Sequence, residues 1–218
     1  MTSILATGEA TKARLESRPD VQKVPTPKLD LFRMRAFASD EECAALIDMI
    51  ERRRRPSTLS DDTSGDAAFR TSETCDMDEA DPVVARINLR FCEILGIDAA
   101  LGEPLQGQRY LVGQEFKAHT DYFDPRGMDL KSTRSVMGQR TWTAMVYLNT
   151  PEAGGATRFK AIGKTIQPVA GMMLAWNNRR ADGSVNPSTL HHAMKIRAGR
   201  KYVLTKWFCE HPWPSGRG

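Results

Sequence analysis

The chain has 218 residues, a formal net charge of +4 and a pI of about 8.9. This charge is too small to indicate nucleic-acid binding by itself, which argues against nucleic acid as a partner. No apolar run approaches the roughly 18 residues of a membrane helix, and the first residues lack the pattern of a signal peptide. The four cysteines also lack zinc-binding spacing. These features predict a protein with no membrane association that works in the cytoplasm.

The N-terminal region divides at about residue 28. Residues 1–28 are polar and end in "VQKVPTPK", which predicts a loosely ordered arm with no more than a turn of helix. Residues 29–218 then form one domain, because one large domain suits a β-rich chain of this length. Its first segment, "LDLFRMRAF" (29–37), alternates in the manner of a strand.

Two helices are predicted next in the chain. In "SDEECAALIDMIERRRR", Ser39 is a suitable N-cap and Glu42 stands at the position that completes a capping box. The arginine run 52–55 at its end indicates a solvated helix terminus rather than a nucleic-acid patch. The second helix lies within 81–97, where Asp81 caps it, Pro82 takes the first helical position and Gly96 ends it.

The segment 57–81 between these helices is rich in Ser, Thr, Asp and Gly. It predicts a long mobile loop with a short strand near Arg70-Thr71-Ser72. Long loops of this kind in compact domains are usually functional or disordered.

After Gly102 the hydrophobic pattern changes from helical to strand-like spacing. Short alternating segments such as "QRTWTAMVYLN" and "RKYVLTKWF" are separated by Gly, Pro and Asn, while "PEAGGATRF" and "NRRADGSVNPS" are expected to be turns or loops. Helices followed by roughly eight strands predict a mainly β fold with flanking helices (α+β), built on a jelly-roll or barrel core.

The stretch "HTDYFDP" is the first candidate for chemistry. His119 and Asp121 are two residues apart, so in a strand their side chains point to the same face. An imidazole and a carboxylate together suit a divalent cation, although such a histidine is more often a satisfied core residue. A metal would need a third ligand from further along the chain, where His191, His192 and His211 are available.

The stretch "TLHHAMKIRAGRKYVLTKWF" supplies that ligand and a cation. Two histidines and one carboxylate form the facial triad of non-haem Fe(II) oxygenases, which leaves coordination positions open. His191 and His192 point to opposite faces of a strand, so only one of them can be the ligand. Lys201 can lie on the neighbouring strand and meet the far carboxylate of a dianionic co-substrate. Arg197 and Arg200 are the alternative cations.

At this point the chain resembles the prolyl 4-hydroxylase family of 2-oxoglutarate- and Fe(II)-dependent dioxygenases. The motifs that carry the resemblance cover about residues 29 to 208 in the family's order: "FASDEEC", "RTS", "DPVVARI", "LQGQRYLVGQEFKAHTDYFD", "GQRTWTAMVYLN", "GGATRF" and "LHHAMKIRAGRKYVLTKW". The resemblance implies a double-stranded β-helix (jelly-roll) core and three Fe(II) ligands, His119, Asp121 and His191. It also implies that Lys201 binds the distal carboxylate of 2-oxoglutarate.

The resemblance implies roles for five more residues. Tyr110 and Thr157 match positions that hydrogen-bond 2-oxoglutarate. Arg140 and Trp207 match residues that line the peptide side of the catalytic site, and Arg70 and Arg140 are expected to bind substrate. Without the resemblance, a structural role is open for Tyr110, for Thr157 and above all for Trp207.

The implied activity is O2-dependent hydroxylation of a prolyl residue in a peptide or protein, with oxidative decarboxylation of 2-oxoglutarate to succinate and CO2. Ascorbate would keep the iron as Fe(II). The alternatives are a relative that acts on a free amino acid or other small molecule, and a non-catalytic metal-binding or sensor barrel. A nucleic-acid demethylase is a weaker rival, because "RAGRKYVLTKW" lacks an "RxNxxxR"-like strand.

Two departures from the family pattern concern the substrate. The chain has His191-His192-Ala193 where members often have His-Ala-Gly, and Cys209 where members often have a histidine. The sequence does not name the substrate or indicate the oligomeric state.

Overall fold

The computed structural model describes residues 4–58, 66, 68–123 and 136–213. The α-helices in these ranges are α1 (Ile4–Glu16), α2 (Asp40–Arg53) and α3 (Pro82–Leu95). The strands are β1 (Val21–Lys23), β2 (Leu31–Met34), β3 (Arg55–Pro56), β4 (Glu73–Asp76), β5 (Gln106–Tyr110), β6 (Phe116–His119), β7 (Arg140–Tyr147), β8 (Ala153–Gly154), β9 (Thr157–Phe159), β10 (Lys164–Ile166), β11 (Met173–Asn177), β12 (His191–Ala193), β13 (Ile196–Ala198) and β14 (Lys201–Cys209).

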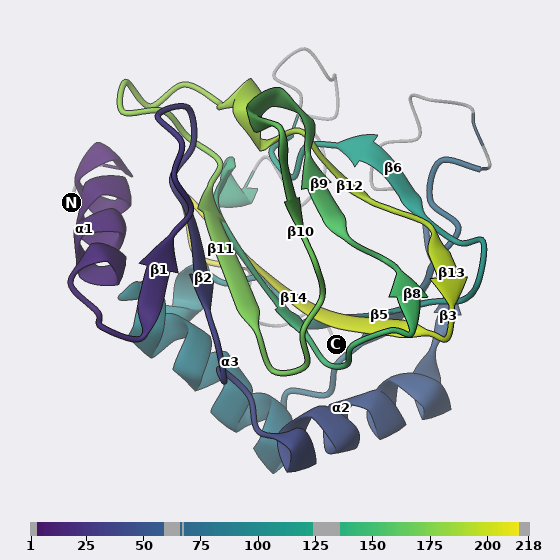
Figure 1. Cartoon of the computed structure of the whole chain (residues 1–218). Coiled ribbons are helices and arrows are strands. Elements are labelled where there is room, and N and C mark those ends of the chain that lie inside the picture. The colour runs from purple at the N-terminus through teal and green to yellow at the C-terminus, as the bar shows by residue number, and fades with distance from the viewer. Residues whose placement is uncertain (1–3, 59–65, 67, 124–135, 214–218) are drawn as a thin grey trace.

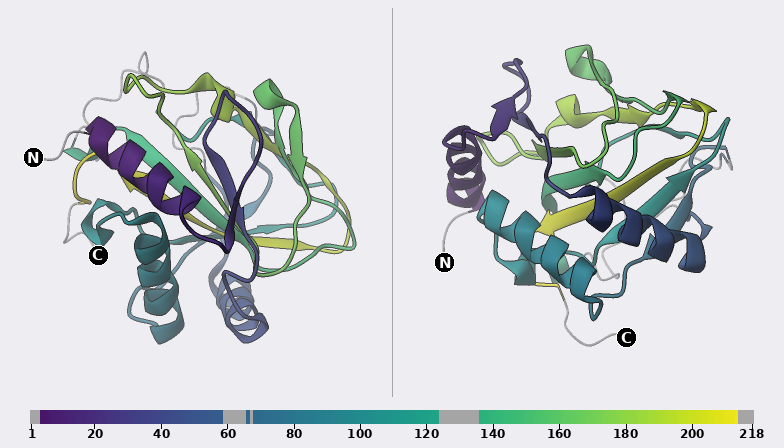
Figure 2. Two further views of the ribbon diagram at one scale, coloured as in Figure 1. Left: turned by 60° about the vertical axis from the view of Figure 1, so that its left-hand side comes forward. Right: turned by 60° about the horizontal axis from the view of Figure 1, so that its bottom comes forward.

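Most of these strands form two facing sheets with helices on one side (Figure 1), and β8 pairs separately with β13. The large sheet has the order β1-β2-β11-β7-β14-β5-β4-β3, and the smaller sheet has the order β10-β9-β12-β6. Helices α2 and α3 lie against the outer face of the large sheet, as the turned views also show (Figure 2). This arrangement agrees with the predicted mainly β fold with flanking helices.

The central strands explain the layering, because successive side chains of a strand point to opposite faces. On β7, Trp142, Ala144 and Val146 join the hydrophobic cluster beneath the helices, whereas Met145 and Tyr147 join the cluster between the sheets. The cluster between the sheets is buried, so much of the space between the sheets is a packed interior.

The helix boundaries follow the local signals in the sequence. Ser39 and Glu42 form the predicted reciprocal capping box at α2. Asp81 caps α3, Pro82 begins it, and Gly96 ends it in the left-handed conformation at φ 68°. The arginine run at the end of α2 forms ion pairs with acids on α2, β4 and the following turn, as expected of a helix terminus.

The expectation of a loosely ordered arm over residues 1–28 is wrong for the described residues 4–28. Helix α1 packs against α3 (Figure 2), with Leu15 fully buried and Arg14 donating through Nε to the carbonyl of Glu93 at 2.9 Å. Strand β1 pairs with β2 and extends the large sheet. The arm is therefore integrated into the domain, and it is stabilised by tertiary packing rather than by local sequence.

Two strands lie elsewhere than expected. The strand expected near Arg70-Thr71-Ser72 begins at Glu73, and Arg70 instead makes an isolated bridge to Phe116. Part of "PEAGGATRF", expected to be a turn, forms β8 and β9. The long mobile loop was expected over 57–81; residues 59–65 and 67 of this segment lie outside the described residues, and Glu73–Asp76 forms β4.

None of the helices in the described ranges is long and apolar enough to cross a lipid bilayer. All four cysteines are buried free thiols.

Candidate active site

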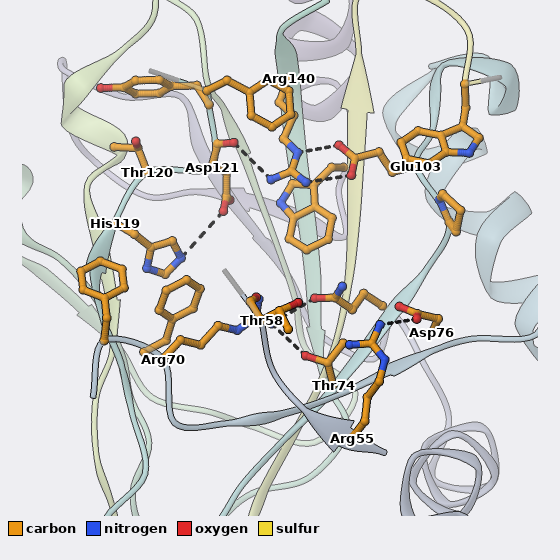
Figure 3. Close-up of a pocket in the computed structure, with 18 residues that line it drawn as sticks. Arg55, Thr58, Arg70, Thr74, Asp76, Glu103, His119, Thr120, Asp121 and Arg140 are labelled. Atoms are coloured by element: carbon orange, nitrogen blue, oxygen red, sulfur yellow. Dashed lines mark hydrogen bonds and ion pairs between the residues drawn. The ribbon is translucent and has the colours of Figure 1, made fainter. Parts of the chain in front are cut away.

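The two histidines and the aspartate of the expected triad converge at one end of the smaller sheet. Strand β12 pairs antiparallel with β6 so that His191 stands directly opposite His119, with ring centroids 4.2 Å apart. Asp121 follows β6, and its Oδ1 lies 3.8 Å from Nε2 of His119 (Figure 3). One candidate ligand atom from each residue lies within 4.8 Å of the others. The three side chains could therefore hold one metal ion.

The protonation state of both histidines suits metal binding. Nδ1 of His119 lies 2.8 Å from the carbonyl of Lys117, and Nδ1 of His191 lies 2.9 Å from the carbonyl of Thr189. A carbonyl only accepts, so Nδ1 carries a proton in both rings, and Nε2 is the ring atom available to bind a metal. Burial, and then the neighbouring His191, hold the pKa of His119 well below its usual value. Both imidazoles can act as neutral nitrogen ligands.

A buried chain of hydrogen bonds fixes the Asp121 carboxylate. The Thr143 hydroxyl donates to Oδ2 of Asp121 at 2.8 Å, and Nδ2 of Asn178 donates to the Thr143 hydroxyl at 2.9 Å. Thr143 and Asn178 are fully buried. Because the Asn178 amide uses the hydroxyl as acceptor, the hydroxyl proton must point to Asp121. Oδ1 is thus left toward the histidines, as a single-oxygen metal ligand requires.

Lys201 lies in a small pocket behind the triad. Its side chain is only 1% exposed, and Nζ lies 5.3 Å from the ring centroids of both Tyr110 and Tyr147. Burial lowers the pKa of Lys201 to about 7. No carboxylate in the described part of the chain pairs with this ammonium. Such a buried cation is expected to gain stability from a bound anion. Arg197 and Arg200, the alternative cations, are exposed.

Tyr110 and Thr157 line the same pocket, and Tyr147 contacts Thr157. Tyr147 donates its hydroxyl to Oγ1 of Thr157 at 2.7 Å, and Tyr110 donates to Oε1 of Gln108 at 2.9 Å. Gly155 (φ +73°) lies against the Lys201 stem, where an added Cβ would stand 3.2 Å from Cδ of Lys201. The same Cβ would stand 2.6 Å from Cδ1 of Ile196, so the positive φ and the close packing of Ile196 both require glycine here.

Arg140 connects the triad with the outer wall of the site. It forms a two-pronged ion pair with Glu103 and donates from Nη1 to the carbonyl of Asp121 at 3.2 Å (Figure 3). Its guanidinium also lies 4.1 Å from the ring centroid of Trp207. Trp207 is 8% exposed, and its indole nitrogen has no hydrogen-bond partner among the described residues. Arg140 and Trp207 thus form one wall beside the candidate metal centre.

An open cleft of about 460 Å³ lies in front of the triad. Its lining is rich in aromatic side chains and includes Phe69, Tyr122, Phe123, Trp207 and Trp213. Arg70, His119, Asp121 and Trp207 line both this cleft and the pocket of Lys201. The triad therefore stands at the boundary between an outer cleft, large enough for part of a peptide, and a small inner pocket.

The comparisons with known proteins agree with this geometry. A sequence profile described as the 2OG-Fe(II) oxygenase superfamily matches residues 105–209. The chain is 30% identical over 200 residues to probable prolyl 4-hydroxylase 10 of Arabidopsis thaliana, covering 81% of this chain and 68% of that protein. The chain belongs to the prolyl 4-hydroxylase family. It is also 31% identical over 196 residues to prolyl 4-hydroxylase subunit alpha-1 of Homo sapiens, which covers 88% of this chain and 36% of the human subunit. The chain thus spans about a third of the animal subunits that it matches.

Solved structures support the fold of this family member. The viral collagen prolyl hydroxylase of Paramecium bursaria Chlorella virus-1, in its complex with 2-oxoglutarate, superposes with a TM-score of 0.65. The match covers 89% of this chain and 98% of that one at 24% identity. The predicted jelly-roll core with flanking helices is confirmed.

His192 and Cys209, the two departures from the family pattern, lie in different parts of the site. His192 points away from the triad, and its Nε2 lies 2.8 Å from Oε2 of Glu115. Cys209 is buried behind the cleft wall, where its thiol donates to Oε1 of Glu103 at 3.4 Å. His211 is exposed. Of the three downstream histidines, only His191 joins the triad.

Sequence reasoning missed four residues that support the site: Gln108, Thr143, Asn178 and Glu103. For Thr143, the alternation of β7 was an available signal, because it lies on the same face as Met145 and Tyr147. Gln108 and Asn178 have uncharged partners, and Glu103 has a partner far along the chain, so no sequence pattern marked these three residues.

Proposed function

We propose that this chain catalyses 2-oxoglutarate-dependent hydroxylation of a prolyl residue in a peptide or protein. The observation that carries the proposal is the buried His119–Asp121–His191 triad between an inner pocket with an unpaired lysine and an outer aromatic cleft. The names of the family relatives support the choice of a prolyl substrate. The Nε2 atoms of His119 and His191 and the single free oxygen of Asp121 fit Fe(II), which prefers such a ligand set.

When bound, Fe(II) with 2-oxoglutarate would supply the oxidising chemistry, consuming O2 and releasing succinate and CO2. The chain's own residues would bind and orient the reactants. Nε2 of His119, Nε2 of His191 and Oδ1 of Asp121 would hold the iron, and Lys201 would bind the distal carboxylate of 2-oxoglutarate. Tyr110 and Thr157 would hydrogen-bond that co-substrate from the pocket wall.

On the cleft side, Arg140 and Trp207 would place the substrate beside the iron. Glu103 holds the guanidinium of Arg140 in a fixed plane. The N–H groups of Arg140 that Glu103 does not use therefore keep a fixed direction. The cleft also extends past Phe69 and Trp213, which offers a peptide more contact area than a free amino acid could use. Free thiols at all four cysteines support a reducing compartment, the cytoplasm, and ascorbate is expected to maintain Fe(II).

The test is incubation with Fe(II), 2-oxoglutarate and ascorbate, together with a panel of proline peptides and free amino acids. The expected result is a mass gain of one oxygen on proline in a peptide, with matching formation of succinate. Oxygen transfer to free amino acids alone would favour a small-molecule enzyme. Metal binding without succinate formation from any substrate would favour a sensor barrel.

A further inference from the structure

The charged residues that line the outer cleft do not all pair with one another. In the described part of the chain they are three arginines, Arg55, Arg70 and Arg140, and three acids, Asp76, Glu103 and Asp121. Arg55 pairs with Asp76, and Arg140 pairs with Glu103 (Figure 3). Arg70 and Asp121 remain, and no ion pair joins them.

Arg70 is bound only by neutral acceptors among the described residues. Its guanidinium donates to Oε1 of Gln106 at 3.0 Å and to Oγ1 of Thr74 at 3.2 Å. Contacts with the Ser72 hydroxyl and the Thr58 carbonyl are longer, at 3.3 Å each. The guanidinium also stacks over the Phe116 ring, 4.8 Å from its centroid. Burial lowers the pKa of Arg70, as expected for a cation that lacks an anion.

Asp121 is the one acid among the described lining residues without an arginine partner, and it does not offset this charge once a metal is bound. Oδ2 of Asp121 already accepts from Thr143, and Oδ1 faces the histidines. In the inner pocket, the charge of Lys201 would be matched by 2-oxoglutarate. A loaded site therefore retains one uncompensated positive charge, which lies on Arg70 beside the iron ligands.

Building on the proposed function, we infer that Arg70 binds a carboxylate of the substrate next to the target proline. Two sources have this chemistry: an acidic side chain on a neighbouring residue, or the C-terminal carboxylate of a chain that ends in proline. Because Arg70 lines both the cleft and the inner pocket, the carboxylate must lie on the proline itself or on an adjacent residue. The substrate class is thus an acidic proline-containing peptide.

The test compares labelled peptides in matched pairs. Two pairs place Glu or Gln directly before or directly after the proline, with both ends capped. A third pair ends in proline, either as the free carboxylate or as the amide. Dissociation constants are measured by fluorescence anisotropy, with metal-free protein and with the anaerobic Fe(II)/2-oxoglutarate complex, and KM and kcat follow from hydroxylation assays.

At least one acidic peptide should bind the natural protein roughly tenfold or more tightly than its neutral match, the usual size of a charge-assisted contact. The peptide pair with the largest difference in affinity identifies the source of the carboxylate. Arg70→Gln should abolish the preference through KM rather than kcat, and Arg70→Lys should keep part of it. Arg55→Gln, which removes a cleft arginine that already has an acid partner, should retain the preference.

Equal affinity for both members of every pair would overturn the inference, and this comparison needs no variant. A preference that survives in Arg70→Gln would also overturn it. An Arg70→Gln variant that needs more 2-oxoglutarate equally with every peptide would show that the anion is the co-substrate instead. Hydroxylation of acidic and neutral peptides alike would leave the proposed function standing, whereas no oxygen transfer to any peptide would refute that function itself.

Discussion

At the scale of single residues, Lys201 combines full burial with the lack of an anionic partner among the described residues. Because burial lowers its pKa to about 7, the empty protein carries the cost of desolvating an ammonium. Lys201→Met should therefore raise the thermal midpoint of the protein without 2-oxoglutarate. The same variant should lose the further rise that 2-oxoglutarate gives to the natural protein. Thermal scans with and without the co-substrate measure both effects.

The pH dependence gives an independent check on Lys201. Between about pH 7 and 10.5 the unfolded chain binds a proton at this lysine and the folded chain does not. The free energy of unfolding should therefore rise with pH in that window, and Lys201→Met should remove this contribution. If the two proteins show the same slope, the ammonium is better solvated than the structure indicates.

A second prediction concerns 2-oxoglutarate use. Lys201→Ala should raise the 2-oxoglutarate concentration for half-maximal rate roughly ten- to hundredfold, the equivalent of one lost charge-assisted contact. Steady-state assays measure it, with Arg197→Ala as the matched control on an exposed cation. A large effect in Arg197→Ala and none in Lys201→Ala would move the role to the arginine.

Thr143 should act as a positioning residue for the metal ligand Asp121. Thr143→Val keeps the shape of the side chain and removes its hydrogen bond, so metal affinity should fall about 10- to 100-fold. Thr143→Ser should restore most of the affinity, since it restores the hydroxyl. Calorimetric titration with Mn(II) measures the affinity without turnover. An unchanged affinity in Thr143→Val would show that the iron site holds Asp121 without help.

His191 and His192 provide a paired test of strand register. His191→Ala should abolish metal binding, because its ring faces His119, whereas His192→Ala should retain it, because its ring faces Glu115. Metal titration of both variants gives the ranking, and the reverse ranking would refute the assignment.

The charged and metal-binding residues were easier to predict from the sequence than the residues that hold them in place by hydrogen bonds. His119 and Asp121 were found by same-face spacing, and the structure brings them together with His191. Asn178 was missed because a buried amide in a strand-end loop carries no local signal; its role appears only once β11 and β7 are paired.

At the scale of elements, Glu42 ties two helices together. Its carboxylate accepts from Arg90 and Arg86 on α3 and caps the backbone of Ser39 at α2. The hydrogen bonds from Arg90 are the largest cause that lowers the pKa of Glu42 from 4.5 to about 2. Glu42→Gln should reduce the free energy of unfolding at pH 7 by about 2–3 kcal/mol.

The difference between Glu42→Gln and the natural protein should shrink as pH falls from about 4.5 to 2. Glu42 is protonated in the unfolded chain first, so the stability that its ionised form contributes is lost in that window. Urea unfolding at several pH values measures the difference. Glu41→Gln, at an exposed neighbouring acid, is the control and should change stability little.

Local signals predicted some elements and could not predict others. Helices α2 and α3 carry their start and stop residues in sequence, so their bounds were predictable to within a residue or two. Helix α1 has few apolar residues and depends on α3, and β9 follows two glycines that resemble a turn. The partner of α1 lies far along the chain, and β9 pairs with both the nearby β10 and the distant β12, which spacing alone does not show.

At the scale of the whole molecule, two buried hydrophobic clusters support the fold without a metal. Treatment with EDTA should therefore abolish turnover while leaving a cooperative thermal transition. Circular dichroism and an activity assay on the same sample check both, and re-addition of Fe(II) should restore turnover. Loss of the cooperative transition on chelation would show the triad to be structural.

The overall architecture was the most predictable level. Helices first and strands afterwards, with the motifs in family order, were enough for the jelly-roll core with flanking helices. The predicted division at residue 28 was wrong because the polar N-terminal segment packs onto the domain. Strand β1 pairs with β2 of the large sheet, and helix α1 packs against α3.

Strand β14 sets a fixed span between the two ends of the site. Lys201, Val203, Thr205 and Trp207 face inward along it, while Tyr202, Leu204 and Phe208 pack beneath the helices. At the usual rise of a strand, the backbone distance from Lys201 to Trp207 is roughly 20 Å. Insertion of one residue between them would exchange the two faces beyond the insertion, sending the indole under the helices and placing Lys206 or the inserted residue at the cleft wall. Only insertions or deletions of an even number of residues within β14 would therefore keep the lysine and the indole on the same face.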